Sequence, residues 1–149
     1  MKLRTRARYS MRMMMAIAKL SSAGKYAGLG EVSRHCNLSR KYLEQLIPAL
    51  RSASLVKAIS GRGGGYRLAK SASDIKVGDI IQAAIGPISV TECVSDVDGC
   101  LHADFCKCRG LWELVNFRII QVLDEFSLAE VMDENFPARV SRELRAERE

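Results

Sequence analysis

Five residues, Gly61-Arg62-Gly63-Gly64-Gly65, separate two short β-prone segments and limit what the middle of this chain can fold into. The flanking segments are residues 55–60 (LVKAIS) and 66–69 (YRLA). Two such runs around a glycine-containing tip predict a β-hairpin. The tip matches neither the P-loop nor the dinucleotide fingerprint, because each requires its own glycine spacing and a following helix. The segment therefore predicts a hairpin and argues against a nucleotide-binding loop.

Apolar residues upstream of this hairpin recur at helical spacing. They predict helices over 5–20 and 29–36, and a third helix that begins after Ser39. The apolar positions are Met13, Met14, Ile17, Leu20, Leu29, Val32, Cys36, Leu43, Leu46, Ile47 and Leu50. Asn37 is suited to a left-handed stop and Ser39 to an N-cap. Two helices joined by a short turn and followed by a hairpin are typical of a winged helix-turn-helix, in which the hairpin is the wing. Pro48 leaves two alternatives, a kinked third helix or a shorter one.

The second helix of such a motif presents polar side chains to base edges in the major groove of DNA. The candidate DNA-binding residues of the third helix are Ser39, Arg40, Lys41, Tyr42, Glu44, Gln45 and Arg51. Arg62 at the hairpin tip suits the DNA backbone or the minor groove. The alternative is an ordinary amphipathic helix whose polar side is solvated.

The charge distribution supports a nucleic-acid partner. Residues 1–70 carry 15 Lys and Arg against two acidic residues, a net +13, whereas residues 71–149 carry 8 against 15, a net −7. A half that is so basic favours double-stranded DNA, because binding releases the counterions of the phosphates. The alternative is a soluble domain with uneven surface charge.

The length and the N-terminal segment exclude several protein classes. A chain of 149 residues corresponds to about one domain, which excludes a multidomain enzyme. His35 and His102 belong to no recognisable catalytic arrangement, so we expect no enzymatic activity. The apolar run 13–18 ends at Lys19 and is too short for a secretory signal. We therefore expect a cytoplasmic protein without a membrane partner.

Four of the five cysteines are concentrated between positions 93 and 108, with the spacing Cys-x6-Cys-x5-Cys-x-Cys. Disulfides are rare in the reducing cytosol, so metal binding or redox chemistry is favoured. Dense thiolates select iron–sulfur clusters, zinc or copper(I), and structural zinc sites prefer Cys pairs two to four residues apart. An iron–sulfur cluster is therefore favoured, with zinc and a metal-free segment as alternatives. Cys36 lies on an apolar helix face and is expected in the core.

The second half of the chain predicts a short strand and helix over 75–84 and a long helix over 109–126. The long helix carries two apolar stripes, of which one can pack on the domain and the other on a second copy of the chain. The alternative is a helix buried on both sides. Residues 127–130 (SLAE) form a capping box, and a charged, frayed tail is expected after Phe136-Pro137. The expected organisation is a DNA-binding region (1–85), a cysteine-rich loop (86–109), a dimerisation helix with a short following helix (110–133) and a flexible tail (134–149).

Taken in order, these features resemble the IscR/NsrR-type winged helix-turn-helix regulators of the Rrf-two superfamily over residues 1 to about 133. The matching stretches are Lys2-Leu3-Arg4, Arg8-Tyr9, Tyr42-Leu43-Glu44-Gln45-Leu46, Leu55-Val56, the tip followed by Tyr66-Arg67-Leu68, Val77-Gly78-Asp79-Ile80-Ile81, the spaced cysteines, Leu111-Trp112 and Ser127-Leu128-Ala129-Glu130. The resemblance implies a mainly α fold with a small β-hairpin wing and a long dimerisation helix.

The resemblance also implies the ligands of a cluster. In cluster-binding relatives three cysteines ligate it, and they correspond to Cys93, Cys100 and Cys106. The fourth ligand in IscR-like members is a histidine at the position of Arg109, and an arginine cannot serve as a ligand. Cys108 is the nearest substitute and His102 an alternative. A 2Fe–2S cluster is expected, with 4Fe–4S as the alternative.

The resulting hypothesis is a homodimeric DNA-binding transcription regulator. It would sense cluster status or redox and nitrosative stress through the cysteine segment and change its affinity for an imperfectly palindromic operator. The alternative is a cluster-free regulator of the same fold that is thiol-based or zinc-stabilised. A small electron-transfer protein is disfavoured, because it would need neither the basic half nor the wing.

Overall fold

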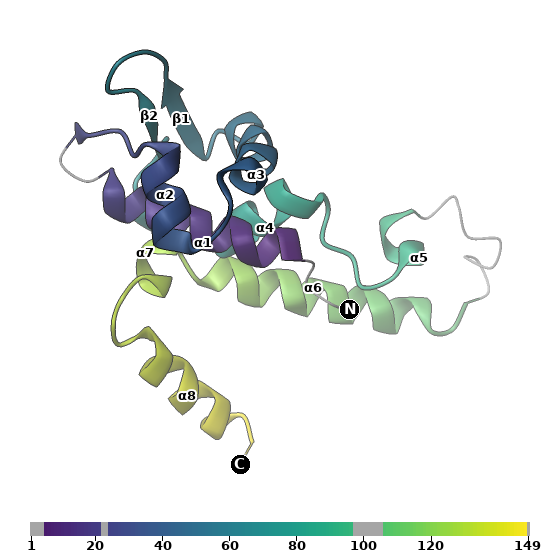
Figure 1. Cartoon of the computed structure of the whole chain (residues 1–149). Coiled ribbons are helices and arrows are strands. Elements are labelled where there is room, and N and C mark those ends of the chain that lie inside the picture. Colours follow the sequence, from purple (N-terminus) through teal and green to yellow (C-terminus); the bar gives the residue numbers. More distant parts are fainter. Residues whose placement is uncertain (1–4, 22–23, 97–105, 149) are drawn as a thin grey trace.

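The computed structural model describes residues 5–21, 24–96 and 106–148, which form helices and one antiparallel hairpin (Figure 1). The elements are α1 (Thr5–Leu20), α2 (Leu29–Cys36), α3 (Arg40–Ser52), β1 (Val56–Ile59), β2 (Gly65–Leu68), the 3-10 helix η2 (Ala72–Asp74), α4 (Val77–Ile85), α5 (Glu92–Ser95), α6 (Arg109–Glu125), α7 (Leu128–Val131) and α8 (Phe136–Ala146). The predicted fold class, mainly α with a small β-hairpin wing, is confirmed.

The helix-turn-helix forms where the sequence predicts it. Asn37 ends α2 in the left-handed conformation, with φ 53° and ψ 48°. The Ser39 hydroxyl accepts a hydrogen bond from the Tyr42 backbone N–H at 3.2 Å and caps α3. Both signals depend only on residues within the turn and the first turn of α3, which is why the sequence could predict them. Of the two alternatives at Pro48, the shorter third helix is wrong, because α3 continues past this residue to Ser52.

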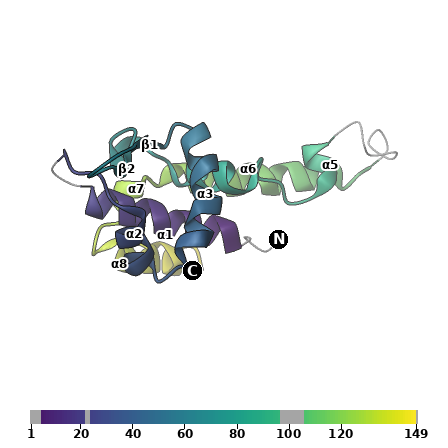
Figure 2. The same ribbon diagram turned by 45° about the horizontal axis from the view of Figure 1, so that its top comes forward.

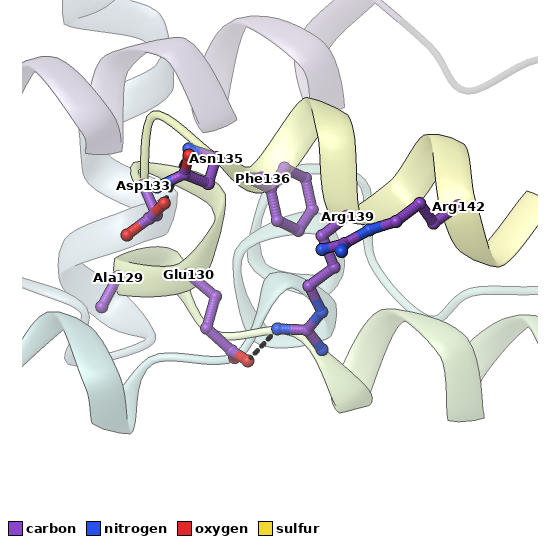
Figure 3. A pocket seen from close by; sticks show the side chains of 7 residues that line it. All are labelled: Ala129, Glu130, Asp133, Asn135, Phe136, Arg139 and Arg142. Carbon is purple, nitrogen blue, oxygen red and sulfur yellow. Dashed lines mark hydrogen bonds and ion pairs between the residues drawn. The ribbon is translucent and has the colours of Figure 1, made fainter.

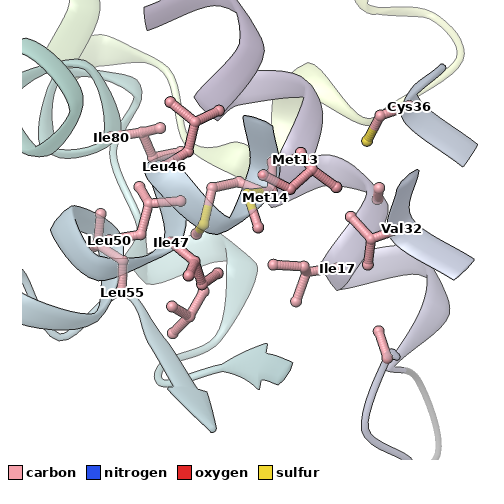
Figure 4. Close-up of a cluster of buried hydrophobic side chains, with 14 of the residues drawn as sticks. Met13, Met14, Ile17, Val32, Cys36, Leu46, Ile47, Leu50, Leu55 and Ile80 are labelled. Carbon is pink, nitrogen blue, oxygen red and sulfur yellow. The ribbon is translucent and has the colours of Figure 1, made fainter. Parts of the chain in front are cut away.

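The core surrounds α1, which contacts α2, α3, α4 and β2. Met13, Met14 and Ile17 of α1 are fully buried among apolar side chains of the other helices, as Figure 4 shows. Burial of one such side chain contributes roughly 1.5–3 kcal/mol relative to exposure. Cys36 belongs to this cluster, as predicted. Leu128 of α7 completes it from the far end of the chain and is also fully buried.

The hairpin pairs Val56 with Leu68 and Ile59 with Gly65. A further pair of hydrogen bonds, which the sequence did not predict, joins the outer edge of β2 to the segment before α2. Ala27 N–H donates to the Tyr66 carbonyl at 2.8 Å, and Tyr66 N–H donates to the Ala27 carbonyl at 2.9 Å. The wing is therefore attached to the helix-turn-helix on both sides.

The strand expected before α4 is reduced to an isolated bridge between Lys76 and Ser127. The adjacent Leu128 N–H donates to the Ile75 carbonyl at 2.8 Å. These bonds attach the chain after α6 to the segment that leads into α4. The capping box at the start of α7 is present as predicted.

Helix α6 extends beyond α4, the helix on which it packs (Figure 1). Its C-terminal half, with Ile119, Ile120 and Leu123, packs on a second apolar cluster that includes Val77 and Ile81 of α4. Its N-terminal half extends beyond α4 toward α5, as Figures 1 and 2 show. Most of the exposed apolar residues therefore lie in the part of α6 that extends beyond α4. Each of the two predicted stripes contains both packed and exposed residues.

The expectation of a frayed tail after Phe136-Pro137 is not what the structure shows, because residues 136–146 form the helix α8. Pro137 lies in its first turn, where its missing N–H has no cost. The rings of Phe136 and Phe126 pack edge to face with their centroids 5.4 Å apart. Arg139 pairs with Glu143 one turn along and with Glu130 of α7. None of the helices in the described part of the chain has the length and apolar character needed to cross a membrane.

Candidate nucleic-acid interface and cysteine segment

The first turns of α3 expose most of the predicted base-contacting side chains. Ser39, Lys41 and Gln45 are exposed on the helix surface. Arg40 and Glu44 are also exposed, by 70% and 52%, and are paired with each other at 3.1 Å. An exposed ion pair of this kind is worth about 0–1 kcal/mol, so a phosphate or a base can displace either partner.

Tyr42 differs from the other candidates because its ring is half-buried. It packs edge to face on Tyr9 of α1, with the centroids 5.6 Å apart and the ring planes at 89°. The guanidinium carbons of Arg8 and Arg12 lie 5.8 Å and 5.9 Å from the Tyr9 centroid. Tyr42 therefore also fixes α3 on α1, a role that the sequence pattern does not distinguish from DNA contact.

Arg51 and Arg62 complete the predicted set. Arg51 is exposed in the last turn of α3, and Arg62 is exposed at the tip between β1 and β2. The tip turns tightly, because the Gly64 N–H donates to the Gly61 carbonyl at 3.0 Å. Gly61 and Gly63 have φ of 99° and 80°, which strongly favour glycine. The wing thus holds one arginine on a short glycine turn.

Arg6 is a residue that the sequence analysis did not single out. Its Nε donates to the Ala84 carbonyl of α4 at 3.2 Å, and its Nη2 donates to the Gln45 carbonyl of α3 at 3.4 Å. Ala84 lies in the last turn of α4, where carbonyl groups lack helical partners and a cation is favourable. Arg6 therefore joins α1, α3 and α4 at the middle of α3.

The cysteine segment is described at its two ends. Cys93 lies in α5 and is half-buried, with its Sγ 3.2 Å from the Thr91 hydroxyl. Cys106 is half-buried and Cys108 is exposed at the start of α6. These three thiols are free, and α5 contacts α6. Cys100 and His102, the other predicted ligand candidates, lie outside the described residues.

The donor chemistry fits a group that is held by thiolates. Three free thiols are carried by segments at the two ends of one loop, and soft thiolates are the donors that iron–sulfur clusters and zinc select. Among residues 5–21, 24–96 and 106–148, no three possible ligands are assembled into a metal site. Arg109, at the position of the expected histidine ligand, is paired with Glu113 at 2.8 Å.

A buried polar side chain connects this segment to α6. Asn116 is the one buried residue of α6, and its Oδ1 accepts a hydrogen bond from the Val90 N–H at 3.1 Å. Val90 lies in the stretch that leads from α4 to Cys93. Apolar periodicity alone could not reveal Asn116, since it appears in the sequence as a polar interruption of the stripes.

An open pocket of about 390 Å³ lies between α7 and α8 (Figure 3). The Glu130 carboxylate accepts hydrogen bonds from the Ser127 N–H and hydroxyl, both at 2.8 Å, and pairs with Arg139 at 2.9 Å. The bond from the Ser127 backbone N–H, followed by that from Arg139, lowers the pKa of Glu130 to about 2. Ser127, Glu130 and Arg139 thus use their polar groups on one another, and these bonds join α7 to α8 along the wall of the pocket.

Comparison with known proteins shows the same architecture in transcription regulators. Residues 3–134 match the Rrf2 family, described as "Iron-dependent Transcriptional regulator". The chain is 37% identical over 141 residues to the HTH-type transcriptional regulator IscR of Vibrio atlanticus, which covers 95% of this chain and 80% of that protein. It is 35% identical over 133 residues to IscR of Escherichia coli O1:K1, which covers 89% of this chain and 81% of that protein.

Solved structures agree with these matches. CymR, titled the global cysteine regulator of B. subtilis, aligns with a TM-score of 0.70 and 35% identity and covers 89% of this chain and 96% of its own. The structure of T. potens IscR aligns with a TM-score of 0.69 and 34% identity and covers 89% of this chain and 86% of its own.

Proposed function

The chain belongs to the Rrf2 family of transcriptional regulators, and on that premise we propose that it is a homodimer whose affinity for its operator responds to an iron–sulfur cluster. Regulation of transcription through DNA binding is common to this family, and the protein is not an enzyme. The cluster, the dimer and the form of the operator are the parts that we propose. We further propose that it acts in the cytoplasm on double-stranded DNA.

The observation that carries the cluster is the position of the free thiols. Cys93, in α5, and Cys106, shortly before α6, lie at the ends of one loop, and α5 and α6 are in contact. We assign Cys93, Cys100 and Cys106 as ligands, with Cys108 as the fourth and His102 as its alternative. Arg109 cannot ligate and is engaged with Glu113. A 2Fe–2S cluster is expected, with 4Fe–4S as the alternative.

When bound, the cluster would supply a group whose redox state and occupancy depend on the chemistry of the cell. The chain provides a path from this group to DNA. Asn116 joins the stretch before Cys93 to α6, and α6 packs on α4. Arg6 bridges the end of α4 to the Gln45 carbonyl of α3. A displacement of α5 relative to α6 would therefore reach the helix that contacts bases.

For DNA contact we assign the exposed residues at the start of α3 and Arg51 at its end, together with Arg62 of the wing. Arg40 and Lys41 suit phosphates or guanine, Gln45 suits adenine, and Glu44 can accept from a cytosine amino group. In a two-fold dimer the operator would be an imperfect palindrome with half-sites about one or two helical turns apart. The DNA-binding, cluster-binding and dimerisation regions would end at the predicted boundaries, which are residues 85, 109 and 133.

The deciding experiment is anaerobic purification with quantitation of iron and sulfide. We expect thiolate-to-iron absorption that Cys93→Ala abolishes. The matched control is Cys36→Ala, because this buried thiol lies in the core between α1 and α2 and should leave the absorption unchanged. A colourless protein that contains zinc would refute the cluster proposal and leave the DNA-binding assignment intact.

Two observations favour a second candidate, a cluster-free regulator that is thiol-based or zinc-stabilised. Arg109 replaces the expected histidine ligand, and the fold matches CymR, whose title names it a cysteine regulator. In that case, DNA binding would depend on thiol oxidation or zinc, and added iron and sulfide would change neither its absorption nor its affinity for DNA.

A further inference from the structure

Three side chains from three neighbouring segments form a row across the outward face of the wing. Lys57 of β1 is the register partner of Arg67 of β2, and the Ala27–Tyr66 bridge brings Tyr26 alongside Arg67 on the other edge. The guanidinium carbon of Arg67 lies 5.0 Å from the centroid of the Tyr26 ring. We call Tyr26, Arg67 and Lys57 the wing row.

The wing row faces away from the core. Alternate residues of a strand point to opposite faces. Val56 is buried and Tyr66 packs against the core cluster, so the neighbouring Lys57 and Arg67 point outward, and both are exposed. Lys57 and Arg67 therefore belong to the exposed surface of the hairpin, whose tip carries the exposed Arg62.

Two like charges directly opposite each other in a sheet destabilise it. Both acidic residues of the basic half are engaged elsewhere. Glu31 accepts a hydrogen bond from the Gly28 N–H at 3.1 Å, and Glu44 pairs with Arg40. Among the described residues, neither Lys57 nor Arg67 has an ion-pair partner.

The arginine of this pair is also held in a way that suits an anion. Arg67 is stacked over Tyr26, so its planar fork of donors loses less conformational freedom on binding than a free side chain would. An arginine presents its donors to phosphate oxygens in a matching geometry, and a lysine adds a point charge beside it. Phosphate is thus the ligand chemistry that this surface fits.

We propose that the wing row is a second phosphate-binding site of the DNA interface, in addition to the tip, and that it contacts the backbone of the duplex beside the position of Arg62. The inference rests on the proposed DNA contact of the wing and extends it from the tip to the stem of the hairpin. It also explains why the fold retains an uncompensated pair of charges: the compensating charge is supplied by DNA.

The test is the salt dependence of binding to a random-sequence DNA duplex, measured with the full-length protein by fluorescence anisotropy. Each phosphate contact contributes about one unit to the slope of log K against log salt. Lys57→Gln and Arg67→Gln should each reduce the slope by about one unit. The matched control is Arg145→Gln on α8, which removes the same charge far from the wing and should leave the slope unchanged.

Lys57→Glu supplies a second readout with the opposite sign. It replaces the repulsion with an attraction to Arg67, so the urea midpoint of unfolding should rise while affinity for the duplex falls. A residue with a purely structural role would not move the two measurements in opposite directions. If the slopes of both glutamine variants equal that of Arg145→Gln, the wing row does not bind phosphate and the inference is refuted.

Different results would refute the proposed function. If the unmodified protein does not bind duplex DNA, or if Arg62→Gln has no effect on the slope, the assignment of the wing itself is lost. If the unmodified protein binds and Arg62 matters, but stability rises in Lys57→Glu with no loss of affinity, the wing row does not contact DNA and only the present inference falls.

Discussion

At the scale of single residues, the capping box that opens α7 predicts a pH dependence of stability. The pKa of Glu130 is lowered from 4.5 to about 2 by the Ser127 backbone N–H and by Arg139. A lowered pKa in the folded state means that the stabilisation is fully present above about pH 4.5 and is lost as the pH falls toward 2. Glu130→Gln should remove this part of the acid transition, as measured by urea unfolding across that range.

Ser127 is the uncharged member of the same capping box. Its hydroxyl accepts a hydrogen bond from the Glu130 N–H at 3.2 Å. Ser127→Ala should therefore lower the free energy of unfolding at pH 7 by about 1 kcal/mol. Parallel acid transitions in Glu130→Gln and the unmodified protein would show that the lowered pKa does not stabilise the fold.

Arg62 is predicted to contribute to DNA binding through charge alone. It is exposed on a glycine turn and has no ion-pair partner among residues 5–21, 24–96 and 106–148. Arg62→Gln should weaken binding to a random-sequence duplex and lower the salt slope by about one unit. Arg62→Lys, which keeps the charge, should restore most of the slope. An unchanged slope in Arg62→Gln would remove the tip from the interface.

At the scale of elements, the attachment of the wing depends on Gly65. A Cβ atom at this position would overlap the carbonyl of Ala27, and the φ of 157° is one that side chains rarely adopt. Gly65→Ala should therefore break the Ala27–Tyr66 pairing and lower the free energy of unfolding by about 1–3 kcal/mol.

The matched control for this variant is Gly30→Ala. Nothing lies within 4 Å of a Cβ at Gly30, which is inside α2. Alanine is the better helix former, so this change should raise the free energy of unfolding by about 0.5–1 kcal/mol. Thermal unfolding of the two variants provides the comparison. An equal effect of both would mean that the contact with Ala27 is not what requires glycine at position 65.

These elements also show how far the sequence could predict the fold. The bounds of α1 and α2 are those that the apolar spacing predicts. Asn37 ends α2 and Ser39 caps the start of α3, as the sequence also predicts. Local signals do not predict a pairing whose second partner lies far along the chain. Ala27 lies in an irregular segment, so no pattern in the sequence predicts its pairing with Tyr66.

The candidate site shows the same limit. The exposure of Lys41, Gln45 and Arg62 follows from local pattern, whereas the burial of Tyr42 against Tyr9 depends on how α3 crosses α1. The helix α8 was missed because its composition is charged; its contacts with Phe126 and Glu130 come from distant elements. Propensity is a weak guide when tertiary contacts supply the stabilisation.

At the scale of the whole molecule, the exposed apolar side of α6 predicts dimerisation. Leu111, Leu114 and Phe117 are exposed by 55%, 54% and 60%. Along α6 they precede Ile119, Ile120 and Leu123, the residues that pack on the cluster with α4. Exposed apolar patches of this kind mark association surfaces. A two-fold contact through α6 would bury them and bring two α3 helices into one assembly.

The double variant Leu114→Glu with Phe117→Glu should therefore shift the protein to a monomer, as measured by sedimentation equilibrium. Leu144→Glu is the matched control, because Leu144 on α8 is exposed to a similar degree, 54%, and lies off α6. We expect the control to remain dimeric and the double variant to lose operator affinity. A dimer that survives in the double variant would rule out α6 as the contact.

The closure of the core by Leu128 has a consequence for synthesis on the ribosome. The DNA-binding half lacks one of its fully buried side chains until residue 128 has been made. By then every cysteine of the segment 93–108 has already been translated. Since domains fold as units during translation, the newly made chain presents its thiols before its DNA-binding half can be complete. The order of residues along the chain would thus let the proposed cluster reach its thiols before the DNA-binding half is complete.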